Sequence, residues 1–370
     1  MQRLLLLLCL CSVGAYSADY ASLPALPSGL IQEARLLDME RAGERLVAVG
    51  ERGLIAYSDD EGASWKQARV PSSETLTAVS FPTAEHGWAV GHGGVILHSG
   101  DAGSSWQLQF DGNDANRQKL DYVTDMVMTL EQALEQAPAE TVADLEYELE
   151  EAQFAVEDAE LAVATGPADP FLDVWFANAE QGLAVGAYGM IYSTDNGGLQ
   201  WRLAMAGIEN LEGYHYYSLA ASDTGQLYLS GEAGLLYRSD DGGEVWQRLP
   251  LDYDGSLFGV LVAVDGTVVT FGLRGNIFYS TDSGNSWSEA ALPDAPGLSF
   301  YGGKRLPDGK LVLVGTGGVM ASSSDQGLSF VADIQSSRST FSSVEAIGDD
   351  LLLGGVDGLV HITAARRQRP

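Results

Sequence analysis

The 370-residue sequence has few of the groups with which proteins usually do covalent chemistry. It contains only two cysteines, Cys9 and Cys11, and five histidines. Arg3 followed by an apolar run at 4–10 predicts a secretory signal at 1–17, and both cysteines lie inside it. The exported chain is therefore expected to have neither a disulfide nor a reactive thiol.

Long apolar segments are scarce as well. The run at 4–10 is too short to cross a bilayer of about 30 Å, and no later segment is long and apolar enough to do so. Lipid attachment to Cys11 fits less well than cleavage, because Leu10 stands where a small residue is expected. The sequence predicts a periplasmic or secreted protein without a membrane span.

Positive charge is also in short supply. The chain has 20 Lys and Arg against 51 Asp and Glu, a formal net charge of −31. Nucleic-acid binding depends on basic side chains that neutralise phosphates, so this balance excludes that class of partner. A basic tail at 365–370, with Arg366, Arg367 and Arg369, is the exception and is interpreted as a solvated end.

Glycine, by contrast, is abundant and regularly spaced. The pattern Gly-x-x-Gly followed by an apolar strand occurs seven times, and such a fixed period indicates a repeat architecture. Glycines in these turns supply backbone angles that residues with a Cβ resist. The pairs are Gly50 and Gly53, Gly91 and Gly94, Gly186 and Gly189, Gly231 and Gly234, Gly272 and Gly275, Gly315 and Gly318, and Gly355 and Gly358.

Six of the seven repeats continue with a second pattern, Ser-x-Asp-x-Gly-x-x-Trp, known as the Asp-box. Its short polar side chains are expected to staple a turn, and its Trp to pack between sheets. One carboxylate per box is too few for calcium, which takes 6–8 oxygen ligands. In the third copy Ser193, Asp195 and Gly197 reach the Trp with one extra residue. The predicted box residues are Asp60 and Trp65, Asp101 and Trp106, Asp195 and Trp201, Asp241 and Trp246, Asp282 and Trp287, and Asp325 and Phe330.

The repeat spacing predicts an all-β, seven-bladed propeller of four-stranded blades. Successive box aromatics are 41 to 45 residues apart outside one insertion, the length of a blade. Blades 1–2 are assigned to 18–112 and blades 3–7 to 170–364. The last repeat lacks an Asp-box and an outer strand, so we expect a segment around Asp19–Ile31 to supply that strand and close the ring.

Residues 113–169 interrupt the repeats with a different composition. Between Asn113 and Thr165 there are 14 acidic and 2 basic residues and no glycine. Apolar residues follow a 3-4 spacing on either side of Pro138, which predicts two helices in an antiparallel hairpin. The apolar positions are Leu120, Val123, Val127, Leu130, Leu134 and Ala137, then Val142, Leu145, Leu149, Ala152, Val156, Ala159 and Val163.

A second apolar row lies opposite the seam of this hairpin. Tyr147, Phe154 and Leu161 are seven residues apart, among many glutamates. The row either rests on the propeller or contacts a partner protein, because apolar rows on an acidic surface are seldom left unused.

No residue set in the sequence predicts catalysis, a metal site or a cofactor. Asp-boxes also occur in sialidases, so a carbohydrate-active enzyme or lectin is the alternative function. The early Phe-Arg-Ile-Pro signature of that class is absent, and the arginines do not recur at one blade position. His86, His92 and His98 fall in one blade at even spacing but are interpreted as ordinary surface or core residues.

What remains is a binding surface. The Gly-x-x-Gly turns join the second and third strands, so all of them, with the helical insertion, are expected on one face around the channel mouth. Charged or aromatic residues at the variable positions of a rigid repeat are candidate partner contacts. They are Glu51, Arg52, His92, Tyr188, Glu232, Arg274 and Asp357, beside the aromatic loop at 214–217.

The repeats resemble the photosystem II stability and assembly factor family. The resemblance rests on Gly-Trp-Ala-Val-Gly-x-x-Gly-x-Ile followed by the Asp-box, best at 87–106 and 182–201, and covers the propeller but not the insertion. It implies an exported seven-bladed propeller, lumenal in a phototroph, that escorts a reaction-centre subunit without catalytic activity. Relatives in other bacteria are often encoded beside membrane exporters of the resistance–nodulation–division class.

The chain departs from that pattern in two respects. Phototroph members share an arginine patch, whereas only Arg52 and Arg274 occupy comparable turns here, and the acidic hairpin is additional. The resemblance therefore implies the mode of action and leaves the client open. We expect a non-enzymatic assembly or accessory factor that binds a membrane protein complex, with a glycan-binding protein or a brace that dimerises through the hairpin as alternatives.

Overall fold

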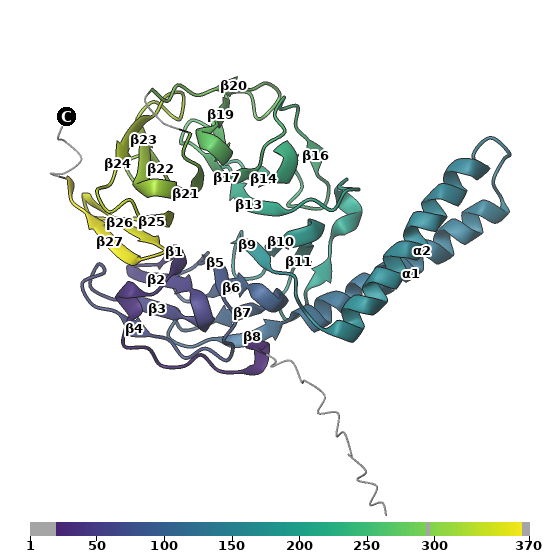
Figure 1. The fold of residues 1–370 in the computed structure, drawn as a ribbon, viewed down its shortest axis with the longest axis horizontal. Helices are drawn as coiled ribbons and strands as arrows, with labels where there is room; N and C mark the ends of the chain where they lie inside the picture. Colours follow the sequence, from purple (N-terminus) through teal and green to yellow (C-terminus); the bar gives the residue numbers. More distant parts are fainter. Residues whose placement is uncertain (1–19, 294–296, 365–370) are drawn as a thin grey trace, which may run out of the picture.

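The chain forms a ring of seven sheets from which a helical hairpin projects (Figure 1). The computed structural model describes residues 20–293 and 297–364. The predicted signal at 1–17, both cysteines and the basic tail at 365–370 lie outside the described residues. Within the described residues, no helix is long and apolar enough to cross a membrane.

The predicted seven-bladed propeller is confirmed. Six sheets have four antiparallel strands in chain order from the channel outward, and the last has three. The first three blades are β1 (Leu36–Ala42), β2 (Arg45–Gly50), β3 (Ile55–Ser58) and β4 (Lys66–Gln67); β5 (Leu76–Ser80), β6 (Gly87–Gly91), β7 (Ile96–Ser99) and β8 (Gln107–Phe110); and β9 (Phe171–Phe176), β10 (Gly182–Gly186), β11 (Ile191–Thr194) and β12 (Arg202–Leu203).

The other four blades follow the insertion without a break in the pattern. They are β13 (Tyr216–Ala221), β14 (Leu227–Gly231), β15 (Leu236–Ser239) and β16 (Gln247–Arg248); β17 (Leu257–Val262), β18 (Val268–Gly272), β19 (Ile277–Ser280) and β20 (Ser288–Glu289); β21 (Phe300–Arg305), β22 (Leu311–Gly315), β23 (Val319–Ser323) and β24 (Val331–Ile334); and β25 (Phe341–Ile347), β26 (Asp350–Gly355) and β27 (Gly358–Ile362).

The Gly-x-x-Gly turns connect the second and third strands, as expected, because their glycines permit close backbone contact. In the first blade the turn is η3 (Glu51–Gly53), and Gly53 has φ +70°. A Cβ there would overlap the backbone oxygen of Ser72, so the position requires glycine on two grounds. The equivalent turns are η4 (His92–Gly94), η5 (Ala187–Gly189), η7 (Glu232–Gly234), η8 (Leu273–Gly275) and η9 (Thr316–Gly318).

The Asp-boxes stabilise the turns on the opposite face of the ring. In the second blade Asp101 Oδ1 accepts the hydroxyl of Ser99 at 2.9 Å and the N–H of Ser105 at 2.8 Å. These bonds satisfy polar groups of the turn locally, which supports the structural interpretation of the box. The same acceptor role, toward a serine two residues earlier, is taken by Asp60, Asp241, Asp282 and Asp325.

The aromatic residue that ends each box packs between its own blade and the blade before it. Trp106 is buried between blades 1 and 2, Trp246 between blades 3 and 4, and Phe330 between blades 5 and 6. Trp65 is partly buried between blades 7 and 1, and Trp287 between blades 4 and 5. The boxes therefore bind neighbouring sheets together, as well as stapling their own turns.

A hydrogen bond fixes the ring of most box tryptophans. The indole N–H donates to the carbonyl of the box glycine at 3.0 Å in Trp65 and Trp246, and at 3.1 Å in Trp106 and Trp287. Phe330 has no such donor, so its ring is held by packing alone, and its backbone N–H donates to the Ala291 carbonyl at 2.8 Å.

The predicted third box is wrong by one residue. Asn196, not Asp195, accepts the hydroxyl of Thr194 at 3.0 Å and the N–H of Gln200 at 3.0 Å. The box is therefore Thr-x-Asn-x-Gly-x-x-Trp with ordinary spacing to Trp201 and no extra residue. Asp195 points outward and forms an ion pair with Arg202 at 3.1 Å.

The predicted closing strand is also wrong for the described residues. Residues 20–31 form no strand, and the last blade has three strands. Most of the segment runs along the first blade: the N–H of Ala25 donates to the Val70 carbonyl at 3.1 Å, and Ala21 is buried in the core between the first two blades. Its end, at η2 (Ile31–Glu33), contacts β27 of the last blade without forming a strand. The first and last blades meet directly through β1 and β25.

The insertion folds into the predicted antiparallel pair, α1 (Gly112–Glu135) and α2 (Val142–Thr165). Asp111 caps α1 by accepting the N–H groups of Asn113 and Asp114. The base is fixed to the third blade, since Gln118 bonds the backbone at Trp201 and Leu203. Beyond that base the two helices pack on each other and extend away from the ring (Figure 1).

Candidate binding site at the channel mouth

The mouth of the central channel is built by an irregularity that all seven innermost strands share. Each has a register shift near its start, so one residue has no partner in the ladder and bulges. These residues lie at the end of each blade where the Gly-x-x-Gly turns are, and all seven line a cavity of about 370 Å³ in the channel. They are Leu37, Thr77, Leu172, Tyr217, Phe258, Tyr301 and Ser342.

Three consecutive blades place aromatic rings at this position. Tyr217 and Phe258 have ring centroids 5.2 Å apart, and Phe258 and Tyr301 are 5.1 Å apart. These separations are typical of edge-to-face aromatic pairs. The rings form a continuous wall on one side of the mouth, and Tyr301 is 42% exposed.

The aromatic wall continues onto the rim of the mouth. His215 lies 6.2 Å from Tyr217, and Tyr188 lies 4.7 Å from His215, measured between ring centroids. Glu232 faces the same histidine at 3.4 Å. We name this set of five rings, Tyr188, His215, Tyr217, Phe258 and Tyr301, the aromatic arc.

Tyr188 occupies a turn position that has a left-handed backbone conformation. It has φ +53°, the left-handed region, where its counterparts in η4 and η9 are Gly93 and Gly317. A tyrosine in that region carries a strain cost that glycine avoids. Arg52, Ala233 and Arg274 adopt the same conformation at this position of η3, η7 and η8, so it is a property of the turn and not of Tyr188 alone.

The second tier of the channel contains two carboxylic acids in equivalent positions. Asp38 on β1 and Asp173 on β9 each follow the bulged residue of their strand. Asp38 accepts the N–H of Val79 on the next blade at 2.9 Å, and Asp173 accepts that of Leu219 at 2.7 Å. Burial, with a smaller contribution from neighbouring acids, raises the pKa of each to about 7.

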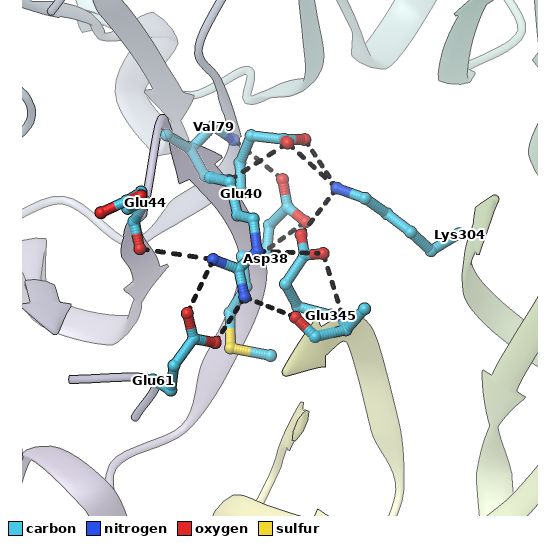
Figure 2. Close-up of polar contacts among 10 residues, drawn as sticks. Asp38, Glu40, Glu44, Glu61, Val79, Lys304 and Glu345 are labelled. Atoms are coloured by element: carbon cyan, nitrogen blue, oxygen red, sulfur yellow. Dashed lines mark hydrogen bonds and ion pairs between the residues drawn. The ribbon is translucent and has the colours of Figure 1, made fainter. Parts of the chain in front are cut away.

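The third tier is a cluster of paired charges. Glu40, Lys304 and Glu345 each lie three residues beyond the bulge, on blades 1, 6 and 7. The Lys304 ammonium is 3.0 Å from Glu40 and 2.8 Å from Glu345, and Figure 2 shows it pointing between them. Although burial alone would lower it, the two carboxylates raise the pKa of Lys304.

Arg41 extends this cluster across the junction of the first and last blades. It donates to the Ala346 carbonyl of β25 at 2.6 Å and to Glu61 at 2.7 Å. Ser342 adds a bond from its hydroxyl to the Leu36 carbonyl at 2.9 Å. Side chains thus join the ends of the ring where a shared strand was predicted.

The charged cluster of Glu40, Lys304 and Glu345 was not predicted from the sequence.

The structure places the predicted mouth residues on the turns of one face, but it brings only some of them together. Tyr188 and Glu232 meet around His215. Glu51 and Arg52 border a groove lined by 20–34, away from the channel. His92 and Arg274 are exposed on turns of blades 2 and 5, and Asp357 is exposed on the turn of blade 7. Their role in binding remains a prediction.

Features that would favour a sialidase-like enzyme do not converge in the channel. Of the channel-lining residues, Arg305 alone is an arginine, and Asp223 pairs with it at 3.1 Å. Within the described chain, no three His, Cys, Asp or Glu residues are grouped so that they could hold a metal. The rings of His86 and His98 lie 3.2 Å apart, whereas His92 is on η4, at the other end of the same blade.

The apolar row on the hairpin is exposed. Tyr147, Phe154 and Leu161 are 65%, 55% and 61% exposed, so the row does not rest on the propeller. The row lies on α2 and is separate from the aromatic arc in the ring. Five exposed glutamates accompany it: Glu146, Glu148, Glu150, Glu151 and Glu157.

The sequence matches the family model described as photosynthesis system II assembly factor YCF48, over residues 30–116 and 155–348. The match covers most of the propeller and omits much of the hairpin. The chain belongs to this family. Its members are assembly factors rather than enzymes, in agreement with the expectation of a non-catalytic protein.

Two curated relatives are each described as a photosystem II assembly lipoprotein Ycf48. The protein of a Synechococcus species is 31% identical over 128 residues, which are 34% of this chain and 38% of the relative. That of Prochlorococcus marinus is 28% identical over 102 residues, 27% of this chain and 30% of the relative. The chain thus spans about a third of these relatives in the matched regions.

Solved structures share the fold. YCF48 bound to D1 peptide superposes with a TM-score of 0.61 at 18% identity, covering 93% of this chain and all of that one. YCF48 from Cyanidioschyzon merolae gives 0.59 at 15% identity, covering 91% and 97%. The WD40 propeller of Doa1 also gives 0.59, at 12% identity, covering 95% and 99%. At these identities the likeness establishes the propeller alone.

Proposed function

We propose that this protein is an exported, non-enzymatic accessory factor that binds a membrane protein complex and contacts it through the hairpin. The exposed row Tyr147, Phe154 and Leu161 carries the proposal. Family membership supports the assembly role, and a solved YCF48 holds a peptide of D1. In this proposal 1–17 directs export, 18–112 and 170–364 form the ring, and 113–169 recognises the client.

The chemistry of the row defines the partner. Its three side chains repeat every seven residues, the spacing with which one helix packs on another. Its glutamates would favour a helix whose apolar row is flanked by Lys and Arg. A second copy of this chain would bring the same glutamates beside its apolar row. Because like charges repel, a dimer formed through the hairpin is the weaker alternative.

The proposal is tested by capture from solubilised membranes with three forms of the protein. One is unchanged, one carries Tyr147→Ser, Phe154→Ser and Leu161→Ser, and the matched control carries Leu199→Ser, Leu211→Ser and Val245→Ser. The control removes three apolar side chains of at least comparable exposure from the propeller. We expect a membrane complex with the unchanged protein and the control, and its loss with the row variant.

A photo-crosslinking amino acid at position 154 then identifies the contact. We expect it to label one segment of a membrane-complex subunit with an apolar row and basic flanks, and the yield to fall at high salt. Equal capture by the row variant would exclude the hairpin as the contact. A crosslink to a second copy of this chain would replace the accessory role by dimerisation.

A further inference from the structure

We infer that the channel mouth binds an arginine or lysine side chain of an extended peptide, held between the aromatic arc and the carboxyl groups of Asp38 and Asp173. This inference rests on the proposed function only for the existence of a protein client. It concerns the propeller, whereas the proposed function concerns the hairpin, so each can fail alone.

The aromatic arc offers ring faces to a cation at the mouth. Tyr217, Phe258 and Tyr301 line the same cavity as Asp38 and Asp173. The face of an aromatic ring attracts a cation within about 6 Å of its centre. The arc gives the mouth one aromatic side, because the bulge positions of blades 1, 2, 3 and 7 carry Leu37, Thr77, Leu172 and Ser342.

The charges below the arc also favour a cation. Among the described residues, Lys304 is matched by Glu40 and Glu345, and Arg305 by Asp223. Asp38 and Asp173 form no ion pair there; they accept backbone N–H groups instead. Two acids that share a cavity and form no ion pair of their own favour a ligand that brings a cation.

The size of the site limits the ligand further. A cavity of about 370 Å³ accepts one long side chain with its backbone but no folded domain. Tyr188 and His215 extend the arc from the cavity to the rim, where neighbouring residues of the same peptide would lie. A sugar could also stack on the arc, but it would not relieve the repulsion between the two acids.

Binding would also be linked to pH through named groups. Asp38 is influenced by Asp173, Glu40 and Lys304, and Asp173 by Glu40. Because both acids have a pKa of about 7, they are largely protonated well below that pH and largely ionised well above it. At the rim, His215 faces Glu232 at 3.4 Å.

The probe is a fluorescein-labelled ten-residue peptide of Gly, Ser and Ala with two arginines, compared with one in which glutamine replaces both. We expect the arginine peptide to bind at least about tenfold more tightly, a difference of about 1.4 kcal/mol. Tyr301→Leu and Asp173→Asn should each weaken it severalfold, whereas Tyr20→Leu, a comparably exposed tyrosine outside the arc, should not. Affinity should also be lower at about pH 5.5 than at about pH 8.

Equal binding of the two peptides, or binding unchanged in both site variants, would overturn the inference. Binding of a neutral oligosaccharide, weakened by Tyr301→Leu and indifferent to Asp173→Asn, would replace the cation by a glycan. Melting curves of each variant separate loss of the site from loss of the fold. Capture of a membrane complex through the hairpin would remain testable in either case.

Discussion

Lys304 of the sixth blade contacts Glu40 of the first, although the seventh blade lies between them in the ring. The ammonium is 3.0 Å from both carboxylate oxygens of Glu40 and 2.8 Å from Glu345 of the intervening blade. One lysine therefore connects three blades at the seam, the place where the first and last blades meet.

Replacement of Lys304 by alanine should destabilise the propeller by roughly 3 kcal/mol. The change removes the closer of two cations from Glu345, which is 3% exposed, and leaves only the Arg41 guanidinium at 3.9 Å, and a poorly paired buried charge is costly. Chemical denaturation of the two proteins measures the free energy of unfolding. Lys310→Ala is the matched control: its pair with Asp308 is half exposed, so we expect a loss of at most about 1 kcal/mol. Equal losses would mean that the seam is not held by charge.

The stability of the protein should decline as the pH rises from about 4 to about 7. Asp38 and Asp173 have an ordinary pKa of 3.8 that folding raises to about 7. Between these values the folded protein binds more protons than the unfolded chain, so the free energy of unfolding falls with pH. Differential scanning calorimetry should give a lower Tm at about pH 8 than at about pH 5.5.

The double variant Asp38→Asn, Asp173→Asn provides the control for that titration. It removes both titrating groups, so its Tm should change less between the same two pH values, whatever its absolute stability. Replacing Asp60 would not serve, because its hydrogen bonds to Ser64 lower the pKa of that acid to about 2. An unchanged slope in the double variant would assign the pH dependence to other groups.

The corrected Asp-box of the third blade makes a simple prediction. Asn196→Ala should cost about 1 kcal/mol, because the N–H of Gln200 and the hydroxyl of Thr194 lose their acceptor. Asp195→Ala removes one exposed ion pair and should cost less than about 0.5 kcal/mol. Thermal unfolding measures the loss of stability in each variant. A larger loss for Asp195→Ala than for Asn196→Ala would support the box as predicted from the sequence, with Asp195 and one extra residue before Trp201.

Removal of residues 20–30 should loosen the first two blades rather than open the seam. Ala21 packs against Val70 and Trp106, and Ala25 bonds the Val70 backbone. Hydrogen exchange should therefore rise in β4 and in the strands around Trp106, while β25 and β26 keep their protection. Faster exchange in β25 to β27 would revive the closing role that the sequence suggested for this segment.

The repeats made the architecture predictable because each repeat carries the sequence motifs of its own turns. Seven glycine pairs and six boxes sufficed for the number of blades, and the 3-4 spacing around Pro138 sufficed for the hairpin. The third box was misplaced because Ser193-x-Asp195 imitates the pattern one residue before Thr194-x-Asn196. The closing role was assigned to the N-terminal segment because the last repeat lacked an outer strand, and no pattern within residues 19–31 indicated which blade that segment would contact.

The channel was less visible in the sequence. Glu40, Lys304 and Glu345 come from strands far apart in the chain, and nothing in the sequence of one strand points to the charges of the other two. Counted back from the first glycine of each pair, Glu40 and Glu345 lie 10 residues away but Lys304 lies 11, because the first hairpin of blade 6 is one residue longer, so the glycine pairs alone do not align the three charges. The aromatic arc needed a further step, because a bulge displaces each residue from the regular alternation of its strand.

Those bulges also bear on how the family can change over time. Thr77 and Ser342 tie one blade to the next through hydrogen bonds to a neighbouring backbone. The other five bulged residues contribute side chains to the mouth while their sheets are held by the strands behind them. Substitution at the five can therefore alter the lining without rebuilding a sheet. Selectivity of the mouth is open to evolution one residue at a time, while the seam and the boxes keep the scaffold constant.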